Sequence, residues 1–388
     1  MQLSVDEVKR AVESMLWNGG GNLLWGFCYQ QQVTEGVMED RRAGYAVRLL
    51  RPPTELTVVA TGLYCILDPD YKPILIGEQD PWPGYKLRNE VKGVEPGAWR
   101  EAIRNLPPEE SLIKSLYSDL LERMDGIYKD KSHNEAIHVL PWVQSPVDTL
   151  SALYTPWRFL EELTFNEASV LKDLDFVTDF TIQFIKLLQK SFPHLTPYCL
   201  EKEVWMPDGI SLWEDQMDIF SRFLPEGYYE SFSMPFTRRI ALEFGGVALH
   251  TCGEVTDRVL EPLGRYEELI AFQYDAAQTP TRRVLDALGD RKLALIPRYS
   301  FAGIDKELRP NTQIQYPLEY VRSMADDWHR QPRMASMFLV VPQTIDSLLD
   351  PGYVSAHGSP HGGVNPVIQN REDLDKIFET LKSLDLLP

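Results

Sequence analysis

Hydrophobic and polar positions follow two different patterns along the chain, and the change between them falls near Ala136. Before it, Leu23–Tyr29 and Thr57–Leu67 are β-branched and aromatic runs typical of strands, and the charged stretch Glu35–Arg51 separates them. After it, short apolar segments alternate regularly with segments whose apolar residues recur at helical spacing. This alternation predicts a parallel sheet with helices between its strands.

In the second part we expect strands at Ile137–Trp142, Ile210–Trp213, Val247–Leu249, Leu269–Tyr274, Leu293–Ile296 and Met337–Val341. We expect helices at Pro146–Leu153, Trp157–Leu163, Asp173–Lys190, Pro280–Leu288 and Leu318–His329, and a long helical region that ends at Phe244. The strands deliver polar or ionisable residues at their carboxyl ends, as expected of a (β/α)8 TIM barrel. A doubly wound open sheet is the alternative, but it would bind its ligand at one switch point.

We therefore expect residues 1–388 to form a single barrel domain. Residues 80–132 are rich in proline and charge and contain one predicted helix, Glu109–Met124, whose leucines and isoleucine form one face. We interpret this segment as an N-terminal elaboration packed over the barrel mouth.

Candidate chemistry lies in Gly245–Val255, an apolar run that ends in a histidine and a cysteine two residues apart. Residues i and i+2 of a strand point to the same side, so His250 and Cys252 would present an imidazole and a thiol together to a metal. One His-x-Cys is a weak motif on its own, because a cysteine is often only a small buried hydrophobic residue.

Composition narrows the class of function. The chain has 39 Lys and Arg against 57 Asp and Glu, a net charge of −18, which disfavours binding to nucleic acid or to an anionic membrane surface. Its four cysteines are widely spaced, as in reduced cytoplasmic proteins. Asp6 and Glu7 stand where a signal peptide would be apolar, and no run approaches the roughly 20 apolar residues of a membrane span. We therefore expect a cytoplasmic protein.

The order of these elements, from about Leu140 to Leu387, resembles the uroporphyrinogen decarboxylase superfamily of (β/α)8 barrels. The matching pieces are LPWVQSPVDTLSALYTPWRFLEEL, DGISLWEDQMDIFSRFLPEGYYESFSMPFTRRIALEFGGVALHTCGEV, ALGDRKLALIPR and SAHGSPHGGVNPVIQN. The resemblance covers about two-thirds of the chain and implies two possible chemistries, because fold alone does not settle function.

One branch of that superfamily decarboxylates uroporphyrinogen and holds the substrate's carboxylates with an arginine-rich N-terminal segment. The corresponding place here, Asn22–Gln32, has no arginine. The other branch comprises zinc-dependent methyltransferases that move methyl groups to or from a corrinoid cobalt, and their zinc ligands include the two residues of a His-x-Cys at this strand end. The resemblance thus implies that His250 and Cys252 are zinc ligands.

A third zinc ligand is less clearly implied. The coenzyme M methyltransferases take a further cysteine from the glycine-rich tail, whereas this tail offers His357 and His361 and has no cysteine. Glu214, at the end of a predicted strand, is our preferred third ligand, although a strand-end carboxylate can also be solvated or ion-paired. His357 and His361 can equally belong to an exposed loop.

Three further residues are candidates for substrate contact. Tyr274 and Asp275 can orient substrate or a zinc ligand, or simply cap the following helix. Arg298 can meet an anionic group or pair with one of the many carboxylates.

The sequence therefore predicts a zinc-dependent methyltransferase acting between a small methylated compound and the cobalt of a corrinoid protein. No cobalamin-binding Asp-x-His-x-x-Gly motif occurs in the chain, so a partner protein would supply the corrinoid in trans. A decarboxylase acting on a smaller acid, and a non-catalytic protein that binds ligands at the barrel mouth, are the alternatives.

Overall fold

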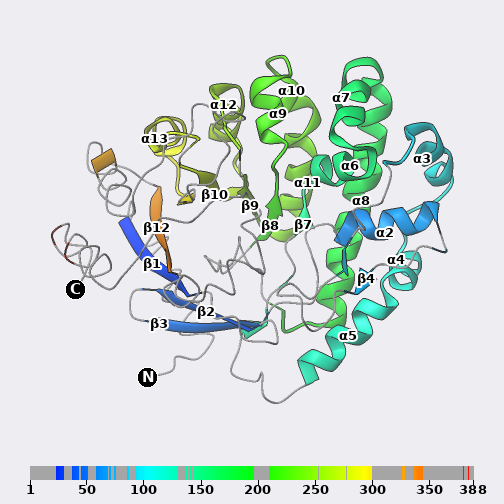
Figure 1. The fold of residues 1–388 in the computed structure, drawn as a ribbon, viewed down its shortest axis with the longest axis horizontal. Coiled ribbons are helices and arrows are strands. Elements are labelled where there is room, and N and C mark those ends of the chain that lie inside the picture. Colours follow the sequence, from blue (N-terminus) through cyan, green and yellow to red (C-terminus); the bar gives the residue numbers. More distant parts are fainter. Residues whose placement is uncertain are drawn as a thin grey trace, which may run out of the picture.

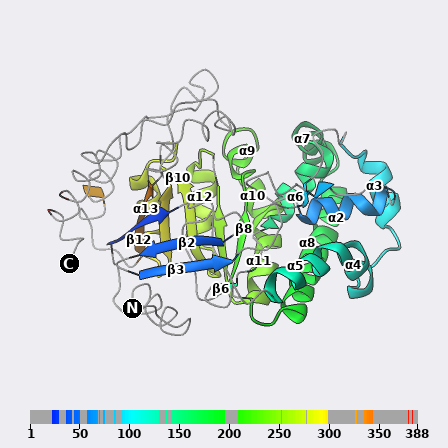
Figure 2. The same cartoon turned by 60° about the horizontal axis from the view of Figure 1, so that its bottom comes forward.

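The structure is a computed structural model of the 388-residue chain, shown from two directions in Figures 1 and 2. It describes residues 23–29, 37–42, 45–50, 58–68, 70, 74–75, 85–86, 93–129, 137–138, 140, 143–195, 209–251, 253–276, 278–298, 326–327, 335–343, 379 and 383. No helix among these residues is long and apolar enough to cross a membrane.

Ten strands form one sheet. They are β1 (Leu23–Tyr29), β2 (Val37–Arg42), β3 (Tyr45–Leu50), β6 (Ile137–His138), β7 (Val143–Gln144), β8 (Ile210–Trp213), β9 (Val247–His250), β10 (Leu269–Asp275), β11 (Ala294–Arg298) and β12 (Ser336–Gln343). Their order in space is β6-β3-β2-β1-β12-β11-β10-β9-β8-β7. A separate antiparallel pair is formed by β4 (Ile74–Leu75) and β5 (Tyr85–Lys86).

From β7 through β8, β9, β10, β11 and β12 to β1, every neighbouring pair of strands is parallel, as the alternation of strands and helices predicts. β2 differs, because it is antiparallel to both β1 and β3. The charged stretch Glu35–Arg51, expected only to separate two strands, therefore contains a β-hairpin. Charged residues are compatible with antiparallel strands, because one face of such strands can lie outside the core.

The sheet is curved, and its two edges are close in the chain. β6 and β7 are the edge strands, and only residues 139–142 lie between them. Five steps of extended chain span at most about 18 Å, so the curvature brings one edge of the sheet back toward the other. Figure 1 shows this curvature. Closure into an eight-stranded ring stays a prediction.

Helices lie on the outside of the curved sheet (Figure 1). They are α2 (Val58–Leu67), α3 (Pro96–Ile103), α4 (Glu110–Leu116), α5 (Ser118–Lys129), α6 (Pro146–Tyr154), α7 (Pro156–Phe165), α8 (Glu167–Ser191), α9 (Met217–Arg222), α10 (Tyr228–Phe232), α11 (Met234–Phe244), α12 (Asp257–Gly264) and α13 (Thr281–Leu288). The predictions that correspond to α6, α7, α8 and α13 are confirmed, and the predicted helical region is α9 to α11. The predicted helix at Leu318–His329 falls mostly outside the described residues.

The prediction of a strand at Thr57–Leu67 is wrong, because this segment forms helix α2. Six consecutive residues, Val58 to Leu63, are buried, since α2 packs against α3, α4, α6 and α8. A segment that is buried on every side carries no helical stripe of polar positions, so its apolar run cannot be distinguished from a strand by periodicity.

The predicted helix Glu109–Met124 is two helices, α4 and α5, which meet at Tyr117. The Tyr117 hydroxyl donates to the carbonyl oxygen of Val58 at 2.9 Å, and its ring lies against Gly62, where a Cβ atom would collide with it. In Figure 2, α2 to α5 gather beside α6 to α8 at one side of the sheet. A cover over the barrel mouth by the rest of segment 80–132 stays a prediction.

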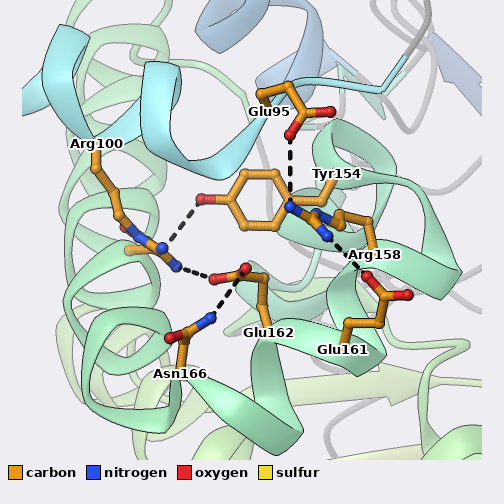
Figure 3. Close-up of polar contacts among 8 residues, drawn as sticks. Glu95, Arg100, Tyr154, Arg158, Glu161, Glu162 and Asn166 are labelled. Atoms are coloured by element: carbon orange, nitrogen blue, oxygen red, sulfur yellow. Dashed lines mark hydrogen bonds and ion pairs between the residues drawn. The ribbon is translucent and has the colours of Figure 1, made fainter.

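A buried ion-pair network holds α3 to the outer helices. The Arg100 guanidinium donates to Glu162 Oε2 at 2.7 Å and to Asp173 Oδ2 at 2.8 Å. The Tyr154 hydroxyl also donates to Asp173, at 3.1 Å, and Asn166 donates to the second oxygen of Glu162, at 3.1 Å. Figure 3 shows Arg100 reaching across from α3 to the carboxylate of Glu162 on α7. A single side chain, Arg100 of α3, therefore links segment 80–132 to both α7 and α8.

Replacing Arg100 with Met should lower the free energy of unfolding by about 3 kcal/mol, because it leaves Glu162 and Asp173, which are 7% and 1% exposed, without their cation. The matched control is Arg158→Met in the same view, which removes only exposed pairs with Glu95 and Glu161 and should change stability little. Urea titrations measure both. Equal effects of the two substitutions would contradict a special role for Arg100.

Candidate active site at the carboxyl ends of the strands

Four side chains form a row across the ends of neighbouring strands. Gln144 on β7 is paired with Trp213 on β8, Trp213 with His250 on β9, and His250 with Gln273 on β10. Paired residues of parallel strands point to the same side of the sheet. We call Gln144, Trp213, His250 and Gln273 the inner row.

The side of the sheet on which the inner row lies follows from the contacts of Glu214 and Tyr274, the residues that come directly after two of its members. Glu214, after Trp213, accepts hydrogen bonds from Ser233 between α10 and α11 and from Tyr229 on α10. Tyr274, after Gln273, donates to Thr281 at the start of α13, at 2.9 Å. Both therefore point toward the outer helices. Because successive residues of a strand alternate, the inner row points to the opposite, concave side.

His250 is held in place from two directions. Its side chain is fully buried, and its Nδ1 atom is in hydrogen-bonding contact with Oε1 of Gln273, which is also fully buried. The indole ring of Trp213 lies over the imidazole, with 3.9 Å between ring centroids and 36° between planes. These contacts define the position and the tilt of the imidazole ring.

The loop after His250 is fixed on both sides of position 252. Thr251 N donates to Gln273 O at 3.1 Å, and Thr279 accepts from Val255 N at 2.9 Å and donates to Gly253 O at 3.4 Å. Gly253 lies so close to Asp218 that a Cβ atom would come within 2.5 Å of the Asp218 Cβ. The backbone around the predicted ligand is therefore well constrained, while Cys252 itself lies outside the described residues.

Asp275 lies on the concave side with the inner row, and the backbone of Arg298 lies beside it. They are paired across β10 and β11, two positions beyond Gln273 and Ile296. The Asp275 carboxylate accepts from the amide of Gln278 at 2.6 Å and is 5% exposed. The backbone thus brings both predicted residues to the same rim as His250.

Two buried carboxyl groups lie near these strand ends: Glu214 directly follows β8, and Asp148 is in the first turn of α6, which follows β7. Burial raises the pKa of Glu214 to about 7, although the hydroxyls of Ser233 and Tyr229 favour its charged form. Burial also raises the pKa of Asp148, and the charges of Asp215 and Glu214 raise it further. Asp148 was not predicted. Its signal is the sequence Ser145-Pro-Val-Asp148, in which Ser145 is the N-cap of α6: the Ser145 hydroxyl accepts from Asp148 N at 3.2 Å and donates to the Asp148 carboxylate at 2.9 Å.

The predicted site residues thus divide into three groups. His250 and Asp275 lie on the concave side, with the backbone of Arg298 beside Asp275, whereas Glu214 and Tyr274 point to the helices. Cys252, His357 and His361 lie outside the described residues. Within the described part of the chain, no three His, Cys, Asp or Glu residues form a group that could hold a metal. The imidazole of His250 is a suitable zinc ligand. The remaining ligands of a zinc site would have to come from residues outside the described ranges.

A scan of the sequence against models of protein families finds no match, and a search of curated proteins finds none. Among solved structures, 20 chains match. One is a methyltransferase from Methanosarcina mazei, with a TM-score of 0.51 and 11% identity over 87% of this chain and 80% of that chain. At this identity the likeness shows a shared mixed α/β fold with a parallel sheet, and no more.

In metal-free protein, Glu214→Gln should change how stability depends on pH. The folded pKa of Glu214, about 7, lies above the ordinary value of 4.5, so the native state retains a proton that the unfolded state releases. The stability of the wild type should therefore fall, relative to Glu214→Gln, as pH rises from about 4.5 to 7, by about 3 kcal/mol in total.

Urea titrations of both proteins between pH 4.5 and 8 measure this difference. The control is Glu230→Gln, which removes a carboxylate of α10 that pairs with Arg265 at the surface and so reports the effect of losing one exposed charge. A stability difference between wild type and Glu214→Gln that stays constant with pH, or grows in the other direction, would contradict the raised pKa.

Proposed function

We propose that the protein is a zinc-dependent methyltransferase that moves a methyl group between a small methylated substrate and the cobalt of a corrinoid protein. The substrate would be a methyl ether, amine or thiol. The observation that carries the proposal is the position of His250, on the concave side at the carboxyl end of β9 and two residues before Cys252. The fold likeness to a methyltransferase from Methanosarcina mazei supports it.

His250 and Cys252 would be two of the zinc ligands. Of the candidates for a third, Glu214 is turned toward Ser233 and Tyr229, which favours His357 or His361. When bound, zinc would act as a Lewis acid toward the heteroatom that carries the methyl group, or would bind a thiol acceptor as the more nucleophilic thiolate. Three protein ligands would leave one coordination position for that heteroatom.

The other residues of the concave side would organise the reaction. Trp213 and Gln273 fix the imidazole, and Thr279 fixes the loop that carries Cys252. Asp275 and Arg298 lie at the rim, where their positions suit contact with a polar substrate. A geometry that is fixed before substrate arrives reduces the entropy lost on the way to the transition state.

A separate protein would bring the corrinoid, because the chain contains no cobalamin-binding motif of its own. The corrinoid is a large group, so it would approach the concave side from the carboxyl ends of the strands, where His250 lies. The helices α2 to α5 sit beside this sheet (Figure 2), and segment 80–132 would contribute to the contact.

Metal content tests the proposal first. The purified wild type should contain about one zinc per chain, and Cys252→Ala and His250→Ala should each lose it. Cys65→Ala is the matched control: this thiol lies in α2, where burial, followed by the charge of Asp68, raises its pKa to about 11 and makes the zinc-binding thiolate rare. Glu214→Gln should also keep its zinc if Glu214 serves the helices rather than the metal.

Elemental analysis of the four variants and the wild type measures this. Wild-type protein that is prepared without chelators and contains no zinc would rule the proposal out. The activity test mixes the protein with a reduced corrinoid protein and candidate methyl ethers, amines and thiols, and follows the cobalt(I) absorbance. The proposal requires at least one of them to methylate the cobalt, or methylcobalamin to methylate a thiol.

The register of Asp275 with Arg298 favours a second candidate, a decarboxylase for a small acid. An arginine near a carboxyl residue at the mouth could hold one carboxylate of such a substrate. Removal of zinc distinguishes the two functions. A decarboxylase of this type would keep its activity without the metal, whereas the proposed methyltransferase would lose it.

A further inference from the structure

Gln273 lies next to His250 because the register of β9 and β10 pairs the two residues. The two residues are direct partners across β9 and β10, and both side chains are fully buried on the concave side. The backbone strengthens the link, because Thr251 N, directly after His250, donates to Gln273 O at 3.1 Å. The backbone of Gln273 is therefore fixed beside His250, and its amide is within reach of the imidazole.

The contact determines which ring nitrogen of His250 carries the proton. The atom of Gln273 at His250 Nδ1 is the amide oxygen Oε1, which accepts hydrogen bonds and cannot donate them. Nδ1 is therefore the donor. In the neutral imidazole, the lone pair must then be on Nε2, since only one of the two nitrogens carries a hydrogen.

Trp213 fixes the remaining freedom of the ring. Its indole lies over the imidazole at 3.9 Å between centroids, and rotation of the imidazole about its Cβ–Cγ bond would drive the ring edge into the indole. With Gln273 at one edge and Trp213 over one face, both the tautomer and the direction of Nε2 are set before any metal arrives.

We propose that Gln273 is a positioning residue, which fixes the tautomer and the direction of His250 so that Nε2 is presented as a zinc ligand. The zinc part of this inference rests on the proposed function, whereas the tautomer part does not. Partners of this kind orient metal-binding histidines, and their loss typically costs about 10- to 100-fold in metal affinity.

The test compares two substitutions of similar size. Gln273→Met removes the acceptor, whereas Gln273→Glu keeps an oxygen acceptor at Nδ1. In metal-free protein with 15N-labelled histidine, long-range 1H–15N spectra report the tautomer of each ring. The seven histidines keep these spectra simple, and His250→Gln identifies the signals of His250. Zinc affinity is then measured by competition with a chromogenic chelator.

In wild type and Gln273→Glu we expect the Nδ1–H form of His250 and similar zinc affinity. In Gln273→Met we expect a mixture of both neutral tautomers and zinc binding weaker by about 10- to 100-fold. A Gln273→Met protein that keeps the pure Nδ1–H form would overturn the inference. So would one that loses this form and still binds zinc as tightly as the wild type, because fixing the tautomer would then contribute nothing to zinc binding.

The experiment distinguishes failure of the proposed function from failure of the role proposed for Gln273. If wild-type protein binds no zinc, the zinc part falls together with the methyltransferase, while the tautomer comparison still decides whether Gln273 orients His250. If Gln273→Met does not fold, as judged by circular dichroism, Gln273→Asn provides the same comparison. It withdraws the amide by one methylene and keeps the site polar.

Discussion

The arrangement of the site depends on one constraint, the in-register parallel pairing of β7, β8, β9 and β10. The pairing lines up Gln144, Trp213, His250 and Gln273 on the concave side. A slip of one residue in β9 would turn His250 toward the helices and bring an apolar neighbour, Leu249, to the concave side. Leu249, Leu212 and Phe272 are fully buried on the helix side, so the same hydrophobic contacts that stabilise the curved sheet also determine where the imidazole points.

Much of the parallel sheet could be predicted from the sequence. The bounds of β8 are those expected, and those of β9 and β10 differ by one residue at their carboxyl ends. Short apolar runs between glycines and polar residues are enough to predict these bounds. Gly209 and Gly246, which precede β8 and β9, adopt positive φ values of 87° and 140° that other residues rarely adopt.

The sequence does not reveal which side of the sheet each residue faces. Strands buried on both faces have no alternation of polar and apolar positions from which their orientation could be deduced. Glu214 and Tyr274 were therefore grouped with His250 because all three end a strand. Pairing between distant strands decides their direction, just as packing among four helices decides the conformation of α2. Both depend on contacts far apart in the sequence, which local patterns do not contain.

At the strand ends, the two sides of the sheet carry different chemical groups. On the concave side, Gln273 and Trp213 fix an imidazole that is suited to bind a metal or exchange a proton. On the helix side, the Glu214 carboxyl group is held by hydroxyls from α10 and the α10–α11 junction, and burial favours its neutral form.

The two sides nevertheless share one backbone, because Glu214 N donates to His250 O at 2.8 Å. Helices α10 and α11 are anchored to Glu214 and therefore, through one peptide hydrogen bond, to the strand that carries His250. A change in the packing of these helices would shift the end of β8 and its indole against the imidazole. The precision of the inner row thus depends on polar contacts that lie on the opposite face of the sheet, outside the site itself.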